Sequence, residues 1–183
     1  MSPITSPRTH RFVSVDVLTT SYRIVGKTMI SNTGVIGMVN NPNSSFIEIH
    51  DARLARIHMP TKLADHYETI RLSKERLYAI ALSRAEDVGP QAIARGGYAQ
   101  TRRYGSFLTL GNYEIEGEIE WQGRFDFSIL MTEGTRNFIP IYDANVTGTI
   151  IPTLKVDAPA ALFNRKQVDL FALLKQRHED KDA

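Results

Sequence analysis

The chain has 183 residues, of which 42% are hydrophobic and 23% are charged, a composition typical of globular proteins. Its 22 basic and 20 acidic residues leave a net charge of +2, so no strong overall field draws it onto nucleic acid or a membrane. It has no cysteine, which excludes disulfides, thiolate zinc sites and cysteine nucleophiles. The first ten residues lack the apolar run of a secretory signal, and no stretch approaches the roughly 20 apolar residues that span a bilayer. We therefore expect a cytoplasmic protein with no membrane insertion.

Two stretches of the chain resemble each other at a spacing of about 92 residues. The matching segments are T-H-R-F-V-S at Thr9 and T-R-R-Y-G-S at Thr101, Y-R-I-V-G at Tyr22 and Y-E-I-E-G at Tyr113, F-I-E-I-H-D-A at Phe46 and F-I-P-I-Y-D-A at Phe138, and M-P-T at Met59 and I-P-T at Ile151. The spacing changes by a single residue, around the Tyr/Gly segments. A register kept so closely indicates a duplicated unit.

In chain order, each copy is predicted to begin with a strand, near 12–18 and 104–110, followed by a turn and a long strand. The long strand alternates between an apolar face and a solvated face. The inward set is Tyr22, Ile24, Gly26, Thr28 and Ile30 in the first copy, and Tyr113, Ile115, Gly117, Ile119 and Trp121 in the second. The central glycines Gly26 and Gly117 predict a tight bend, a bulge or the close approach of another backbone.

Further short strands are expected after a variable segment. Those near 46–49 and 138–141 are predicted to end at the Asp-Ala pairs that begin at Asp51 and Asp143, where the carboxylate would cap the next turn. More strands follow near 54–58 and 146–151, and a last pair lies near 70–72 with 77–82 and near 162–163 with 168–174. Residues 125–131 are predicted to form one or two helical turns. We favour a strand for 77–82, and the end of the second copy, 168–176, fits either a strand or a terminal helix.

These elements predict a mainly β fold, with two tandem copies of a small bent-sheet or barrel domain and short helical segments. The predicted boundaries are a flexible N-terminus at 1–8, copy 1 at 9–82, a linker at 83–100 with a helical turn at 91–95, copy 2 at 101–176 and a charged tail at 177–183.

The glycine-bearing segments Y-R-I-V-G-K-T-M at Tyr22 and Y-E-I-E-G-E-I-E at Tyr113 resemble the second strand of the Sm-like small barrels. The succession of strand, turn, long bent strand and strand pair is similar to that family as well. The resemblance implies a small-barrel architecture for each copy. It also implies, as an alternative function, an RNA-binding module.

Catalytic motifs are missing from the sequence. It has no G-x-x-x-x-G-K-S/T loop, no G-x-S-x-G elbow and no H-E-x-x-H. His50 and His58 would suit a metal together with Asp51, but the second copy has Tyr142 and Ile150 at the histidine positions. We therefore expect no catalytic residues, no metal, no cofactor and no enzymatic activity.

A basic and aromatic surface is the candidate nucleic-acid site. Arginine on phosphates together with aromatic stacking holds single strands. The candidate residues are Arg11, Arg95, Arg102, Arg103 and Tyr104.

The outer faces of the two long strands differ in charge. Arg23 and Lys27 make the first basic, whereas the second carries Glu114, Glu116, Glu118 and Glu120. Complementary charge fixes which surfaces meet. We therefore predict a non-enzymatic assembly protein in which the basic face meets an acidic face, within the chain or between chains. The predicted partner is a second copy or a larger protein complex. An acidic face that merely aids solubility is the alternative.

Overall fold

The computed structural model describes residues 9–90, which we call the first half, and residues 100–175, the second half. The first half contains β1 (Arg11–Thr19), β2 (Tyr22–Ile30), α1 (Gly34–Val39), β3 (Phe46–Arg56), β4 (Asp65–Ser73), the short 3-10 helix η1 (Lys74–Arg76), β5 (Leu77–Leu82) and η2 (Ala85–Val88). The second half contains β6 (Thr101–Leu110), β7 (Tyr113–Gln122), α2 (Phe127–Thr132), β8 (Phe138–Gly148), β9 (Lys155–Asn164), η3 (Arg165–Gln167) and β10 (Leu170–Leu173). The predicted mainly β fold is confirmed.

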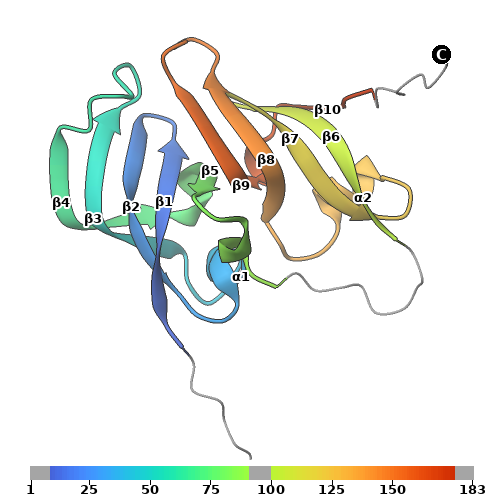
Figure 1. Ribbon diagram of the computed structural model, residues 1–183, viewed down its shortest axis with the longest axis horizontal. Coiled ribbons are helices and arrows are strands. Elements are labelled where there is room, and N and C mark those ends of the chain that lie inside the picture. The colour runs from blue at the N-terminus through green and yellow to red at the C-terminus, as the bar shows by residue number, and fades with distance from the viewer. Residues whose placement is uncertain (1–8, 91–99, 176–183) are drawn as a thin grey trace, which may run out of the picture.

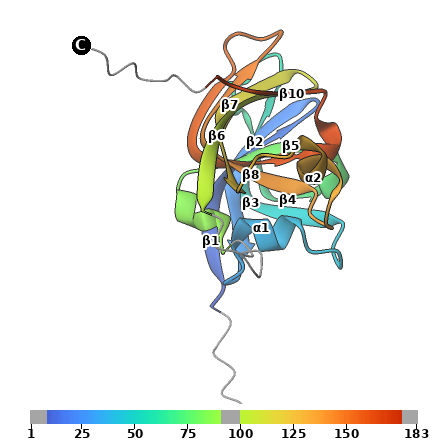
Figure 2. The same ribbon diagram turned by 90° about the vertical axis from the view of Figure 1, so that its right-hand side faces the viewer.

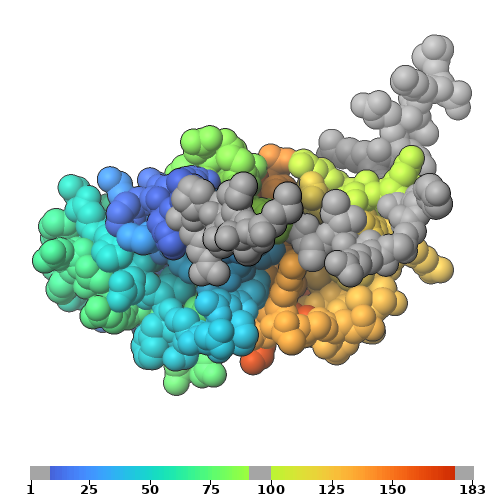
Figure 3. Space-filling model, turned by 90° about the horizontal axis from the view of Figure 1, so that it is seen from below, coloured from blue at the N-terminus to red at the C-terminus, as the bar shows by residue number. Residues whose placement is uncertain are grey.

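All ten strands join one antiparallel sheet in the order β10-β6-β7-β8-β9-β5-β1-β2-β3-β4. The order within the first half, β5-β1-β2-β3-β4, therefore recurs in the second as β10-β6-β7-β8-β9. The halves lie side by side along the long axis of the molecule (Figures 1 and 3). β4 and β10 end the order instead of pairing with each other, so the sheet is bent but does not close into a barrel. Because one sheet runs through both halves, the division into two separate domains is not confirmed.

At the central glycines the next strand approaches closely and the pairing is irregular, as two of the three predicted alternatives require. A Cβ on Gly26 would lie 2.6 Å from Ile49 Cγ2 and 2.8 Å from the carbonyl oxygen of His50. A Cβ on Gly117 would lie 2.7 Å from the carbonyl oxygen of Tyr142. The pairing register of each long strand also shifts beside its glycine. Only glycine allows so close an approach of the next strand.

The strand ends predicted at the Asp-Ala pairs are wrong. β3 and β8 each run on through the aspartate as one strand. Asp51 and Asp143 have φ angles of 49° and 48°, in the left-handed region, opposite the register shift. A single residue of this kind forms a bulge that bends a strand without ending it.

The structure shows whether the short apolar segments, which composition assigned equally well to strand or helix, are strands or helices. Residues 77–82 form strand β5, as favoured, and 168–176 contains strand β10 rather than a helix. Helix α2 lies where it was expected, with the Asp126 carboxylate accepting from the backbone N–H of Ile129. Helix α1 was not anticipated. The predicted helical turn at 91–95 and the tails at 1–8 and 177–183 fall outside the described residues.

In each half, a cationic side chain of the 3-10 helix binds carbonyl groups at the end of the short α-helix. Lys74 Nζ donates to two carbonyls at the end of α1, and burial lowers the pKa of this amine. The Arg165 guanidinium donates to three carbonyls at the end of α2, including Glu133. Cations favour the carbonyl end of a helix. These contacts hold the two helix ends firmly against the sheet.

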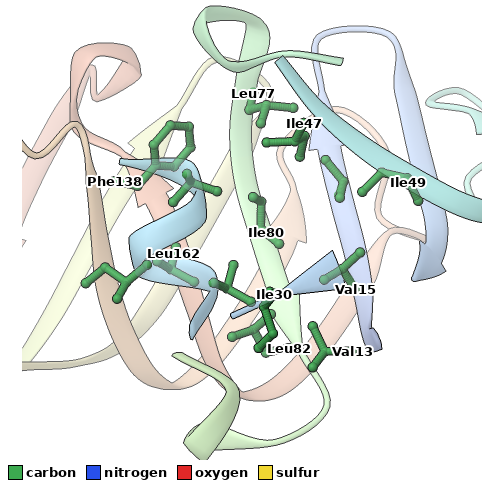
Figure 4. Packing of buried hydrophobic residues seen from close by; sticks show 14 of the residues in the cluster. Val13, Val15, Ile30, Ile47, Ile49, Leu77, Ile80, Leu82, Phe138 and Leu162 are labelled. Atoms are coloured by element: carbon green, nitrogen blue, oxygen red, sulfur yellow. The ribbon is translucent and has the colours of Figure 1, made fainter. Parts of the chain in front are cut away.

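The buried side chains form two clusters, and each cluster contains residues from both halves. The first-half cluster also contains Phe138, Ala160 and Leu162 from β8 and β9. Figure 4 shows Phe138 and Leu162 among the apolar side chains of the first half. The second-half cluster in turn contains Leu18, Ala79 and Ala81 from the first half. The two cores are therefore packed against each other along one line of contact. No helix in residues 9–90 and 100–175 is long and apolar enough to cross a membrane.

Candidate functional site: the central junction and the end strands

The halves meet where β5 pairs with β9, which we call the central junction. Its register is Ala79 with Phe163, Ile80 with Leu162, Ala81 with Ala161, and Leu82 with Ala160. All eight side chains are buried. Because successive strand residues face opposite sides, alternate pairs enter the first and the second core. This is a continuous apolar contact between the halves.

Asn40, the residue that ends α1, holds the start of β8 across the junction. Its Oδ1 accepts from the backbone N–H groups of Asn137 and Phe138 at 3.0 and 2.9 Å. Its Nδ2 donates to the carbonyl oxygen of Phe138 at 3.0 Å. One amide side chain therefore satisfies two donors and one acceptor of the other half, which fixes both the position and the register of the contact.

Among the described residues, three more side chains donate hydrogen bonds from one half to the other. Asn164 Nδ2 donates to the Leu77 carbonyl at 3.0 Å, and Gln167 Nε2 donates to the Glu75 carbonyl at 2.9 Å. The Tyr113 hydroxyl donates to the Thr19 carbonyl, and burial raises the pKa of this phenol. Each of these bonds ends on a backbone group. These three bonds therefore fix backbone positions and do not require a matching side chain in the other half.

The repeated strand order gives every junction residue a counterpart at an end of the sheet. β5 pairs with β1 as β10 pairs with β6, so the four junction residues of β5 have their counterparts 91 positions later, in β10. β9 pairs with β8 as β4 pairs with β3, which matches β9 with β4. β4 and β10, which we call the end strands, lie at opposite ends of the molecule (Figure 1). No described strand pairs with the outer edge of either.

Counterparts differ sharply in exposure. Phe138 is 2% exposed at the junction, whereas Phe46 is 53% exposed at the β4 end. Leu82 is 1% exposed, whereas Leu173 on β10 is 46% exposed. Leu170, the counterpart of buried Ala79, is exposed as well. Figure 2 views the molecule from the end at which β10 and α2 lie. The same positions that pack two cores together at the junction are uncovered at the two ends.

The predicted basic face has partners within its own half. The Arg23 guanidinium contacts the Asp16 carboxylate at 2.7 Å and the Pro60 carbonyl at 3.1 Å, and it is largely buried by them. Lys27 is exposed on β2, near the Asp51 carboxylate, whose pKa is lowered mainly by a hydrogen bond from His66. No ion pair among the described residues joins this face to the glutamates of β7.

The predicted acidic face is partly neutralised by Arg103. Its guanidinium lies 3.3 Å from Glu118, 3.3 Å from Glu120 and 3.4 Å from Asp143. Glu114 and Glu116, on the same face of β7, form no ion pair with another described residue. Four glutamates on one strand therefore present less charge than the sequence alone implies.

Three of the four candidate nucleic-acid residues that the structure describes have partners within the chain. Arg11 contacts the buried Asp87 at 2.7 Å, and Arg103 is held by the carboxylates of β7 and β8. The Tyr104 hydroxyl donates to the Gly123 carbonyl at 2.6 Å, and its ring packs on Phe125. Arg102 is exposed on β6, and Arg95 lies outside the described residues.

No candidate metal centre is present among residues 9–90 and 100–175, where histidine and carboxylate side chains do not gather in groups of three. His50 lies 3.7 Å from Glu48, and His66 lies 2.7 Å from Asp51, as two separate contacts. A polar hollow of about 800 Å³ lies beside the junction. Its lining includes His10, Thr33 and Arg136, and no pair of carboxylates.

Sequence reasoning missed Asn40 and the helix α1 that it ends. Asn40 stands in a polar turn, where asparagine is ordinarily read as a turn residue. The repeat matches Phe46 with Phe138, but only the structure shows that one is exposed and the other buried, so no signal in the sequence pointed to Asn40. No protein-family model, curated protein or solved structure matches the chain.

Proposed function

We propose that the protein is a non-enzymatic structural module that associates with copies of itself through its end strands. β10 of one molecule would pair with β4 of the next, as β5 pairs with β9 inside the chain. The observation that carries the proposal is the contrast between the buried junction residues and their exposed counterparts. An exposed strand edge with apolar side chains is a template for strand addition.

The proposed contact is heterologous, because the surface on β10 differs from the surface on β4. Contacts of this kind close into a ring or grow into a filament. In a variant of this proposal, the partner is a different protein of a larger complex, which pairs with the same strand edges. In that variant only, and not in self-association, the charged faces of β2 and β7 would bias which surface of the different partner approaches. A cytoplasmic location is part of the proposal.

Binding of RNA, the alternative function, has less support. Two of the candidate arginines already contact carboxylates, which leaves few cations for phosphates. A nucleic-acid complex would show as a raised ratio of absorbance at 260 and 280 nm and as binding that weakens steeply with salt.

Sedimentation velocity on nuclease-treated protein over a range of concentrations tests the proposal. The wild type should form species heavier than one chain. Leu173→Lys on β10 should weaken association about tenfold or more, since burying a leucine contributes ~1.5–3 kcal/mol. Met29→Lys is the matched control, because Met29 is equally exposed but lies on β2, away from the end strands. A monomer at every concentration, or equal effects of the two variants, would overturn the proposal.

A further inference from the structure

The residue that ends α2 stands where Asn40 stands in the first half. α1 and α2 are both six residues long and occupy the same place between the second and third strands of their halves. Asn40 ends α1 and Glu133 ends α2, and the N–H of each donates to the carbonyl oxygen four residues back, of Ile36 and Ile129. Their φ angles are similar, −92° and −82°, whereas their ψ angles are 2° and 149°, so the chain leaves the two helices in different directions. Glu133 is exposed, and Arg165 holds its carbonyl oxygen at 2.6 Å. A carboxylate therefore sits at the β10 end of the molecule in place of the junction amide.

The backbone groups that Asn40 binds also have counterparts, at the opposite end of the molecule. The N–H of Arg165 donates to the Asn137 carbonyl, as the N–H of Lys74 donates to the Ser45 carbonyl. Ser45 and Phe46 are thus the counterparts of Asn137 and Phe138. No described side chain accepts from the N–H groups of Ser45 and Phe46.

The start of β8 at the junction and the start of β3 at the β4 end differ in one respect, which would account for an amide at Asn40 and a carboxylate at Glu133. At the junction, the Phe138 carbonyl needs a donor and receives it from Asn40 Nδ2. At the β4 end, the Phe46 carbonyl already accepts from Ser44 Oγ at 2.7 Å. Only two N–H donors then remain to be satisfied. An ionised carboxylate accepts hydrogen bonds and donates none, and it binds N–H groups more strongly than a neutral amide oxygen does.

The apolar surroundings agree with this arrangement. Ile36 of α1 is 3% exposed in the core that Phe138 enters, whereas its counterpart Ile129 of α2 is 39% exposed. Phe46 of a neighbouring molecule, placed as Phe138 is placed, would cover Ile129. The apolar and the polar parts of the contact thus lie on the same two segments.

We propose that Glu133 is a positioning residue whose carboxylate accepts the backbone N–H groups of Ser45 and Phe46 of a second copy of the chain. This sets the register in which β10 of one molecule pairs with β4 of the next. The inference rests on the proposed self-association and names its contact. The expected intermolecular pairs are Leu170 with Leu72, Ala172 with Ile70, and Leu173 with Thr69.

Substitution at position 133 tests the role of the carboxylate. Glu133→Ala should weaken association about tenfold, whereas Glu133→Gln, whose carbonyl oxygen still accepts, should stay within about threefold of wild type. Glu116→Ala, which removes an exposed carboxylate elsewhere, is the control and should change nothing. In a Ser44→Ala background the Gln variant should associate more tightly than Glu133 itself, because its amide can donate to the Phe46 carbonyl. Equal association of the Ala and Gln variants would overturn the role.

Cysteine cross-linking tests the register, and the chain has no cysteine of its own. A mixture of the single variants Leu173→Cys and Thr69→Cys should form a disulfide-linked dimer on mild oxidation. A mixture of Leu173→Cys with Glu68→Cys should not, because Glu68 faces the opposite side of β4. Heavier species that cross-link equally well through Glu68 would overturn the register and leave the self-association standing. A monomer in every sample would overturn both.

Discussion

The central junction and the end strands use the same positions of the repeated strand order, yet one is buried and the other exposed. Phe138 and Phe46 begin equivalent strands, and Leu82 and Leu173 belong to equivalent strands. The difference arises from the neighbour: each junction residue has the other half of the chain against it. The proposed contact surface rests on this contrast between apolar residues that are exposed at the ends and counterparts that are packed at the junction.

The two regions are not equivalent throughout. Arg71 on β4 is the counterpart of buried Leu162, and it forms an exposed ion pair with Glu48 at 2.8 Å. A charge on an edge strand limits unwanted pairing. In the proposed contact, Arg71 would therefore moderate the pairing that the apolar residues of the end strands favour.

Truncation of Phe138 at the junction and of Phe46 at the β4 end should give the largest difference in the free energy of unfolding. Phe138→Ala should lower the free energy of unfolding by ~3–5 kcal/mol, because it leaves a cavity in the first-half core. Phe46→Ala should change it by less than ~0.5 kcal/mol at concentrations where the protein is monomeric. Urea denaturation of both variants measures the two costs. Similar costs would mean that Phe46 is already packed in the single chain.

Removal of the Asn40 side chain should have the next largest effect. Asn40→Ala leaves two N–H groups and one carbonyl of the second half without their partner, which should cost ~1–3 kcal/mol. Asn43→Ala, in the same exposed turn, is the control and should stay within ~0.5 kcal/mol of wild type. Thermal or urea unfolding provides the measurement. An Asn40 variant as stable as the control would show that the strand pairing alone holds the halves together.

Replacement of Arg71 should strengthen the end contact. Arg71→Leu restores the residue type of the junction and should tighten self-association about tenfold, since it replaces a charge with an apolar side chain that can be buried. Its loss of the exposed Glu48 pair should cost the single chain no more than ~1 kcal/mol. Sedimentation velocity gives the association constant. Weaker association of this variant would indicate that the Arg71 guanidinium contributes directly to the contact.

Charge reversal on β7 should have the smallest effect. Glu116→Lys combined with Glu118→Lys removes one exposed ion pair with Arg103, which should change stability by less than ~1 kcal/mol and leave the molecular mass unaltered. The charged-face hypothesis predicts the opposite: a fall in mass that Arg23→Glu with Lys27→Glu restores. Light scattering on the two sets of variants separates contact through the end strands from contact through the charged faces.

Local features were predictable because they depend on neighbours in the sequence. The alternation along β2 and β7 placed Ile24, Thr28, Ile115 and Ile119 inside, as the structure confirms. The inner-face glycines indicated the bend for the same reason, since a missing side chain matters wherever strands approach. Tyr22 is the exception: it was expected inside and is 40% exposed. The charges of Arg23 and Arg103 could not be assessed in this way, because their partners come from other strands.

The order of residues by itself determined the β composition, the repeated pattern and the bent long strands, because alternation and glycine act over a few residues. Only the tertiary structure decided that β5 pairs with β9, that Asn40 holds the start of β8, and that β4 and β10 are left at the ends. Those outcomes depend on backbone groups separated by about 90 residues, and backbone hydrogen bonds carry no signature of their partner in the sequence.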